Sequence, residues 1–468
     1  MKNHMSPELE ALARFATDAK WEDLPGPIVH EIKRLLLDSI GCALTGISVD
    51  PGKMIIALAR RLGGPPEASI IGVGDKVSLF SAVLANGQLI NATDYDAFIS
   101  FHGPGYLFPA PLAVAEATGA SGKDLILATA LACEIAVRVK KAVQPDLAFT
   151  REREGYANMN FGAAAGVGKL LNLDREKMMN ALGIAGHACQ VLTWTHLGAS
   201  KRGYYPKYGF PGWQGTGAVM AALLAEMGYV GDPMVFDPEH GFWKFAGYGG
   251  WAPENITEGL GKTWTFTERA EANPMAVTYK LHICCKIFGA AVDGICDIIA
   301  KNNLTPEDIE SVKVYTPLGS LNWIGLFRNT DIGNIVDAQF SLPFNISVAA
   351  HKVPVGVEWQ DIDTMRNPKI LAFMKKVSVI EGYSGWQKEN VHSLRNRVEV
   401  AANGKTFAED RVEARGISAE VTDGELEKKF RHNAARILTE GKIEGAVKAI
   451  WNLEQVENIS QLMDQIAL

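Results

Sequence analysis

Cysteine is scarce in this 468-residue sequence, and the six cysteines that occur are not arranged as metal ligands. No two of them form a Cys-x-x-Cys pair, and no cluster of cysteine and histidine has the spacing of a zinc site. Cys42, Cys133 and Cys189 lie within apolar runs, which is typical of buried free thiols in a reducing compartment. We therefore expect free thiols and no bound metal.

Long apolar runs and an excess of positive charge are also missing. The longest apolar run, residues 125–133, ends at Glu134 and has about half the length that a membrane span needs. The first residues contain no apolar segment ahead of a small-residue cleavage site, so we expect no signal peptide. The net charge of −7 argues against a dedicated nucleic-acid or anionic-membrane partner. These features predict a cytoplasmic protein with no membrane and no nucleic-acid partner.

Helical patterns dominate the sequence up to about residue 265. A chain of 468 residues is too long for one ordinary core, so two domains are expected. Residues 121–142 are apolar on nearly every face, which is typical of a helix buried inside a larger helical domain. The other predicted helices open at Pro7 or cover residues 28–44, 160–171, 174–186 and 217–227.

Strand patterns appear after about residue 275. Residues 311–316 alternate between apolar and polar side chains, and residues 376–380 form a second strand candidate. The dipeptide Asn403-Gly404 lies between two further candidates, 397–401 and 405–407, and is a strong hairpin signal.

Two helix-start signals accompany these strands. Residues 305–308 (TPED) indicate a short helix before the first strand, and Thr422 with Glu425 fits a capping box that opens the last helices. The sequence therefore predicts a long helical block, a mixed α and β insert, and a helical return.

Asp94, Asp96 and His102 lie within nine residues, in a stretch broken by glycine and proline. A carboxylate and an imidazole near one pocket can divide proton abstraction and donation between them. The alternative is structural: the aspartates would cap the following helix, and His102 would pack against Phe101.

Basic residues form two further candidate groups. Lys201, Arg202 and Lys207 lie among glycines and aromatics just before a helix, which suits an anionic ligand; the alternative is a basic surface loop. Lys280 and His282 alternate with apolar residues, and the alternative for them is the edge of a strand or helix with solvated cations.

Several blocks of the sequence, in their order and spacing, resemble the MmgE/PrpD family, which includes 2-methylcitrate dehydratase, cis-aconitate decarboxylase and iminodisuccinate epimerase. The resemblance covers nearly the whole chain. Its main blocks are KRLLLDSIGCAL (33–44), ASIIG (68–72), KLLNLD (169–174), ALGIA (181–185) and AQFSLPF (338–344).

The resemblance implies a fold that is mainly α, with a large all-helical domain closed by a smaller α+β lid. We expect residues 1–274 and 416–468 to form the helical domain and residues 275–415 to form the lid. It also implies a homodimer, an active site between the two domains, and no metal, nucleotide or flavin cofactor.

Motif positions of the family transfer to particular residues of this chain. Asp94 corresponds to the first aspartate of the acidic motif, His102 to the histidine after it, and Lys280 to the lysine that opens the lid. The loop lysine is Lys207 or Lys201, depending on the direction of counting. The resemblance thus implies His102, Asp94, Lys207 and Lys280 as catalytic residues.

Positions where the chain departs from the family complete the expected substrate site. Asn91 replaces a histidine, His282 replaces a tyrosine, and Phe344 lacks an aromatic hydroxyl. We expect these three, together with Lys201 and Asp96, to contact the substrate. The lost polar groups favour a substrate that is less polar than citrate or carries fewer carboxylates.

The expected function is that of a lyase, a dehydratase-like enzyme for a small carboxylate. His102 would transfer a proton, Asp94 would orient the histidine or relay the proton, and Lys207 and Lys280 would hold the substrate carboxylate. Two other reactions are alternatives: epimerisation, in which the proton returns to the other face, and decarboxylation, in which the carboxylate itself leaves. A relative that only binds a carboxylate is a third alternative.

Overall fold

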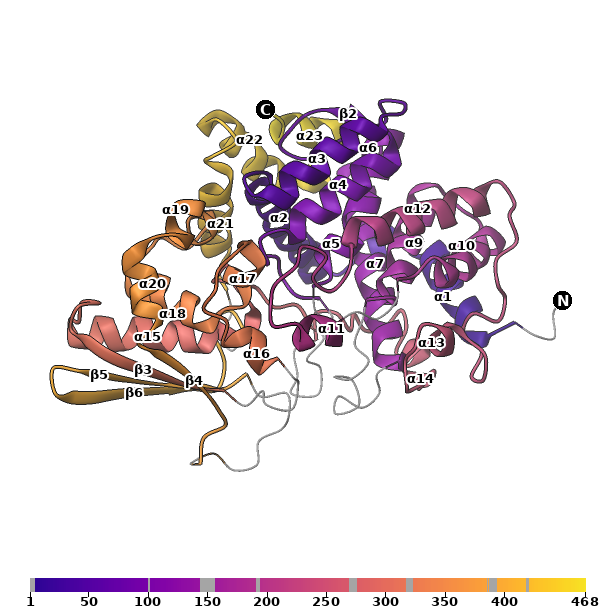
Figure 1. Cartoon of the computed structure of the whole chain (residues 1–468). Coiled ribbons are helices and arrows are strands. Elements are labelled where there is room, and N and C mark those ends of the chain that lie inside the picture. Colours follow the sequence, from indigo (N-terminus) through magenta and orange to yellow (C-terminus); the bar gives the residue numbers. More distant parts are fainter. Residues whose placement is uncertain are drawn as a thin grey trace.

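The structure is a computed structural model that describes residues 5–99, 102–143, 156–190, 194–268, 276–316, 323–384, 386, 394–417 and 421–468. It consists of a large helical body and a smaller part in which helices cover a sheet (Figure 1). The mainly α fold with a smaller α+β part is therefore confirmed. The domain boundaries after residues 274 and 415 stay a prediction.

The helical body is built around α7 (Gly122–Val143), whose buried positions lie on every side of the helix. Its neighbour α9 (Met159–Leu170) approaches it closely. A Cβ atom at Gly162 would lie 2.1 Å from the carbonyl oxygen of Ala132 on α7, so only glycine permits this approach.

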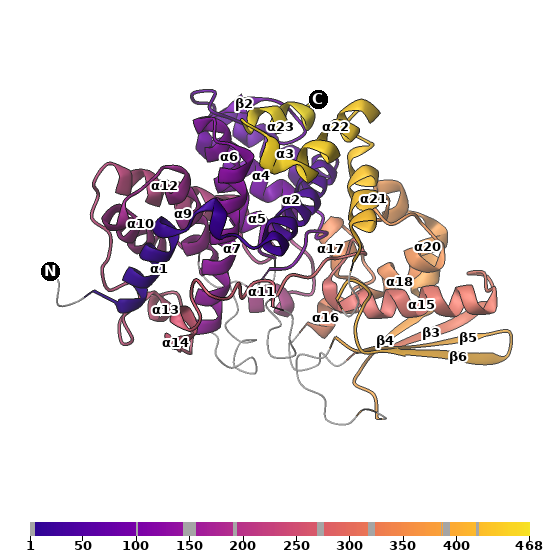
Figure 2. The ribbon, with the colours of Figure 1, turned by 180° about the vertical axis from the view of Figure 1, so that it is seen from behind.

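The other elements of the body surround this pair, and α1 lies beside α10 when seen from behind (Figure 2). They are α1 (Pro7–Asp18), η2 (Trp21–Asp23), α2 (Gly26–Ile47), α3 (Asp50–Leu62), β1 (Ala68–Ser69), β2 (Lys76–Val77), α4 (Leu79–Asn91), α5 (Pro104–Leu107), α6 (Pro109–Thr118), α10 (Arg175–His187), α11 (Trp194–Ala199), α12 (Pro211–Glu226), α13 (Phe242–Phe245) and α14 (Glu254–Thr257).

Most helices predicted from the sequence are present, with one shifted start. The helix expected at residues 217–227 is α12, which begins six residues earlier because Pro211 occupies its first turn. No single helix in the described part of the chain is long and apolar enough to span a membrane. The pair α2 and α3 passes the same test together, but it is bent by 91°.

A four-stranded sheet forms the base of the smaller part, in the order β4-β3-β5-β6. Strand β3 (Ile309–Thr316) pairs parallel with β4 (Val377–Glu381) and antiparallel with β5 (Asn396–Ala402). The hairpin from β5 to β6 (Lys405–Arg411) turns at Asn403 and Gly404, with φ values of 53° and 70°. Both values fit the type I′ turn that this dipeptide predicts.

The smaller part also contains helices, of which α15 lies along β5 and β6 (Figure 1) and α18 contacts β4. They are η3 (Lys286–Phe288), α15 (Gly289–Asn302), α16 (Ile324–Phe327), α17 (Ile335–Phe340), α18 (Leu342–Ala350), η5 (Val357–Gln360), α19 (Ile362–Met365) and α20 (Pro368–Met374).

The prediction of a short helix at residues 305–308 is wrong. The backbone N–H and the hydroxyl of Thr305 both donate to Asp308 Oδ2 at 2.8 Å, so the segment closes into a turn. The chain then enters β3 directly at Ile309.

The chain returns to the helical body through α21 (Asp423–Ala434), which packs against α2. The predicted capping box is present: Thr422 Oγ1 accepts from the backbone of Glu425, whose carboxylate accepts from the backbone of Thr422. The last elements are α22 (Glu440–Trp451), η6 (Leu453–Gln455) and α23 (Ser460–Gln465), drawn in yellow in Figure 1.

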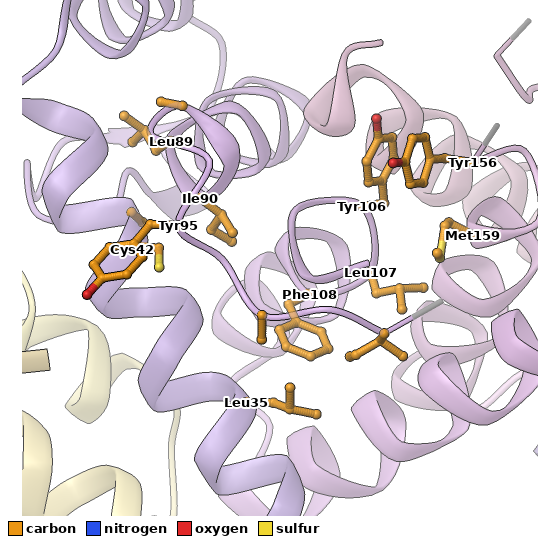
Figure 3. Close-up of a cluster of buried hydrophobic side chains, with 14 of the residues drawn as sticks. Leu35, Cys42, Leu89, Ile90, Tyr95, Tyr106, Leu107, Phe108, Tyr156 and Met159 are labelled. Atoms are coloured by element: carbon orange, nitrogen blue, oxygen red, sulfur yellow. The ribbon is translucent and has the colours of Figure 1, made fainter. Parts of the chain in front are cut away.

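The apolar core of the body anchors the loop that follows α4. Figure 3 shows Leu89 and Ile90 at the end of α4 and, just beyond them, Tyr95 beside Cys42 of α2. Tyr95 is buried, so the loop is held in the core on both sides of Asp94.

Candidate active site

Asp94 is the centre of a buried polar cluster. Its backbone has a φ of 58°, a left-handed conformation that aspartate tolerates better than most residues. Four of the predicted residues are almost inaccessible: Asp94 is 1% exposed, His102 3%, Lys207 4% and Lys280 5%. The alternatives of a basic surface loop for Lys207 and of a solvated edge for Lys280 are therefore wrong.

Two lysines from distant parts of the chain bind the Asp94 carboxylate. Lys207 Nζ lies 3.2 Å from Oδ1, and Lys280 Nζ lies 2.6 Å from Oδ2. The hydroxyl of Tyr208 also donates to Oδ1. Burial opposes the charge of Asp94, but attraction by Lys280 and Lys207 outweighs it and holds the Asp94 pKa well below its usual range.

His102 lies between the two aspartates. Its Nδ1 is 3.2 Å from Asp96 Oδ1, and its Nε2 is 3.7 Å from Asp94 Oδ1. The imidazole is stacked on Tyr208, with ring centroids 4.7 Å apart, and tilted against Phe98 at 4.4 Å. These contacts fix the plane of the ring.

The surroundings of His102 select one tautomer. Asn91 Nδ2 donates to Asp96 Oδ1 at 3.1 Å, so its amide faces the same carboxylate as the histidine. Because Asp96 accepts hydrogen bonds, we assign the proton of the neutral ring to Nδ1 and leave Nε2 as the free base. Burial lowers the pKa of His102, against the pull of Asp96 and Asp94, and so favours this neutral form.

Five successive carbonyl oxygens, from the last residue of α4 into the loop after it, each accept a hydrogen bond from a side chain distant in sequence. We call residues 91–95 the carbonyl row. The pairs are Lys207 to Asn91 (2.7 Å), Gln339 to Ala92 (2.9 Å), Gln360 to Thr93 (2.8 Å), Lys280 to Asp94, and Lys429 to Tyr95 (2.7 Å). The donors come from the helical body, the smaller part and α21, so the position of the loop depends on all three.

The capping alternative for the two aspartates is wrong. The next helix, α5, begins at Pro104 with Gly103 at its N-cap and has no side-chain cap. The carboxylates of Asp94 and Asp96 bind lysine and histidine side chains instead. Phe101, the packing partner suggested for His102, lies outside the described residues.

The remaining predicted substrate residues lie outside the hydrogen-bonded cluster in the described structure. Lys201 is exposed, so Lys207 is the loop lysine that reaches Asp94. His282 Nε2 lies 2.8 Å from Asp293 Oδ1, and Phe344 is buried near the start of α18.

A small cavity adjoins the cluster. Its volume is about 20 Å³, enough for roughly one water molecule. Lys280, His282, Lys286 and Arg415 are among the residues that line it. His282 thus shares a basic cavity with Lys280 although the two do not share the Asp94 contact.

A larger hollow of about 730 Å³ lies elsewhere in the body, between α1 and residues 257–264. None of its lining residues belongs to the Asp94 cluster. Among the described residues, no group of three or more His, Cys, Asp or Glu side chains is placed to hold a metal ion.

Sequence reasoning missed three members of the site. Tyr208 could have been found as the neighbour of Lys207, but a single tyrosine among several in that loop gives no distinctive signal. Asp38 and Lys429 form a buried ion pair of 2.7 Å below the loop. Asp38 lies in a family block, whereas nothing in the local sequence of Lys429 marks it.

Comparison with known proteins adds whole-chain evidence. Residues 10–252 match the family model of the MmgE/PrpD N-terminal domain, and residues 282–455 match that of the MmgE/PrpD C-terminal domain.

Curated relatives match over the same span. The chain is 25% identical to a cis-aconitate decarboxylase of Aspergillus terreus, covering 97% of this chain and 94% of the fungal protein. It is 25% identical to the cis-aconitate decarboxylase-like protein oryM of Aspergillus oryzae, with 97% and 96% covered. It is 22% identical to a human cis-aconitate decarboxylase, with 97% and 93% covered.

Proposed function

The chain belongs to the MmgE/PrpD family, and from this membership we propose that it is a lyase that acts on a small organic acid by proton transfer at His102. The observation that carries the proposal is the contact of His102 and two buried lysines with one carboxylate, Asp94. Buried, coupled titratable groups of this kind are common at catalytic sites.

The two lysines are suited to bind a substrate carboxylate. An ammonium group has three N–H donors. Lys207 directs two of them at Asn91 O and Asp94 Oδ1, and Lys280 directs two at the carbonyl and carboxylate of Asp94. The third donor of each lysine is the one that we assign to the substrate.

The proposed first step is proton abstraction by neutral His102. Nε2 takes a proton from the carbon next to the substrate carboxylate, and the electron pair of the broken C–H bond moves onto the carboxylate oxygens. Lys207 and Lys280 stabilise that charge more in the transition state than in the ground state. Asp96 stabilises the imidazolium that forms. In dehydration, His102 then returns the proton to the hydroxyl on the β-carbon. The C–O bond breaks, water leaves, and the electron pair from the first step forms the C=C double bond.

Decarboxylation is the second candidate, and the names of the matched relatives favour it. In this route the bond between the substrate carbon and its carboxylate breaks, and carbon dioxide leaves. The electron pair stays on the carbon, which accepts a proton from protonated His102. Both routes balance without an external oxidant or reductant, so we propose a cofactor-independent enzyme.

The test is incubation of the purified protein with a panel of di- and tricarboxylic acids, hydroxy acids and amino acids in deuterated water, followed by NMR. Double-bond formation identifies dehydration, loss of a carboxyl carbon identifies decarboxylation, and deuterium uptake with inverted configuration identifies epimerisation. If no acid reacts or exchanges, the lyase proposal is wrong. Saturable binding without reaction would instead support a carboxylate-binding protein.

A further inference from the structure

Lys429 of α21 is a buried lysine that reaches the active-site loop from below. Its Nζ lies 2.7 Å from Asp38 Oδ1 on α2 and 3.7 Å from the centroid of the Tyr95 ring. The side chains are 4% and 0% exposed, so the pair is removed from solvent. Burial raises the pKa of Asp38 above its usual value, and the neighbouring Lys429 charge opposes that rise.

The ammonium of Lys429 has three acceptors on three separate segments. They are Asp38 Oδ1 at 2.7 Å, the carbonyl of Tyr95 at 2.7 Å and the carbonyl of Lys280 at 3.1 Å. Three donors therefore meet three acceptors, which is a complete hydrogen-bond set for a lysine.

Two of these acceptors belong to the candidate active site itself. Tyr95 lies between Asp94 and Asp96, and Lys280 is the residue whose ammonium binds Asp94. Asp38 adds a second tie, because its Oδ2 accepts from the backbone N–H of Ala97 at 2.9 Å. The pair of Asp38 and Lys429 thus binds two backbone segments, one at Tyr95 and Ala97 and one at Lys280. The relative position of these segments decides whether the Lys280 ammonium reaches Asp94.

A purely stabilising role explains this arrangement poorly. Burying two charges costs free energy that their attraction often only offsets, and an apolar pair of similar size is frequently as stable. A methionine would fill the same space but could not hold the carbonyls of Tyr95 and Lys280. What the ion pair adds over an apolar pair is a fixed position of these two backbone segments.

We propose that Asp38 and Lys429 form a positioning pair that sets the distance between the Lys280 ammonium, Asp94 and His102, and thereby the rate of proton transfer. The pair does not touch the substrate. This inference rests on the proposed function only where turnover is the readout.

The test compares the double variant Asp38→Asn/Lys429→Gln with the single variants Lys429→Arg and Lys33→Met. The double variant is neutral and polar, so it leaves no buried charge unpaired. Lys33 is the matched control, because it is also a buried lysine whose Nζ donates to a backbone carbonyl, that of Trp451, at 2.9 Å. Lys33 also forms an ion pair with Glu454, so it too combines a carboxylate with a carbonyl, and both acceptors lie outside the cluster.

We expect the double variant to fold and to lose about 10- to 100-fold in kcat, the scale on which small misplacements of reacting groups act. The single variant Lys429→Arg should lose less kcat than the double variant. Lys33→Met should keep the wild-type kcat although it loses stability. Wild-type kcat in the double variant, or an equal loss in Lys33→Met, would overturn the proposal.

A second readout does not need turnover. The charged groups around His102 are Asp96, Asp94 and Lys280, together with Lys207, which binds the Asp94 oxygen that faces Nε2. The Lys280 charge lowers the His102 pKa. If Lys280 moves away in the double variant, NMR titration of His102 should give a pKa higher than in the wild type. An unchanged value in a folded variant contradicts the positioning role even if no substrate of the enzyme is found.

Discussion

The imidazole of His102 is the group whose chemistry is most directly set by its neighbours. Asp96, itself held by Asn91, fixes its Nδ1 side, Tyr208 and Phe98 fix its plane, and burial lowers its pKa and so favours the neutral form. Each of these contacts can be changed by a single side-chain substitution, so the role of the histidine can be separated from folding.

Replacing His102 by glutamine should lower turnover by about 10²- to 10⁴-fold, the usual contribution of a general acid–base group. The melting temperature should change little, because the glutamine amide can still donate to Asp96. Steady-state kinetics and thermal unfolding measure the two effects. His351→Gln is the control, because that histidine contacts Ser347 O on α18 and not Asp94. Near-normal turnover of the His102 variant would remove this residue from the mechanism.

Stability should fall as pH decreases below about 6.5, the ordinary pKa of histidine. Burial lowers the His102 pKa in the folded state, so the unfolded chain takes up a proton there that the folded chain does not. This contribution is present above pH 6.5 and is lost on acidification. Denaturant unfolding of wild type and His102→Gln between pH 5 and 7.5 tests it. Equal slopes for the two proteins in this window would contradict the expected coupling.

Helix α21 carries Lys429 to the loop, and its capping box fixes where the helix begins. Thr422→Ala should cost about 1 kcal/mol, as loss of an N-cap usually does. Thr439 is the matched control, since it is the N-cap of α22 but makes no side-chain cap hydrogen bond. Thr439→Ala should therefore cost clearly less in the free energy of unfolding. A similar loss in both variants would show that the capping box of α21 contributes nothing specific.

Elements with strong local signals were predictable from the sequence. The apolar surface of residues 121–142, the hairpin at Asn403-Gly404 and the capping box at Thr422 all match the structure, because local geometry decides them. The helix expected at 305–308 failed because the side chain of Asp308 closes a turn on Thr305 instead.

The candidate site was predictable only in part. Asp94, Asp96 and His102 are close in sequence, and the resemblance added Lys207 and Lys280. Counting could not separate Lys201 from Lys207, since only the path of the loop shows which one is buried. The pairing of Asp38 with Lys429 joins residues 391 positions apart, and no local pattern encodes such a contact.

At the scale of the whole molecule, the homodimer implied by the family resemblance stays a prediction. Light scattering coupled to gel filtration should give twice the 50.7 kDa mass of one chain. The measurement should be repeated over a range of concentrations, because association follows mass action. A mass of one chain at every concentration would contradict the expectation.

The carbonyl row also has a consequence for how the protein is made. Its five partners all follow it in the chain, from Lys207 to Lys429, and the last of them comes more than 330 residues after the row. A polypeptide still on the ribosome cannot have all five in place until Lys429 has been synthesised. Products that stop before residue 429 would contain Asp94 and His102 but lack the final restraint on the loop, so reactivity should emerge only after Lys429 has been added.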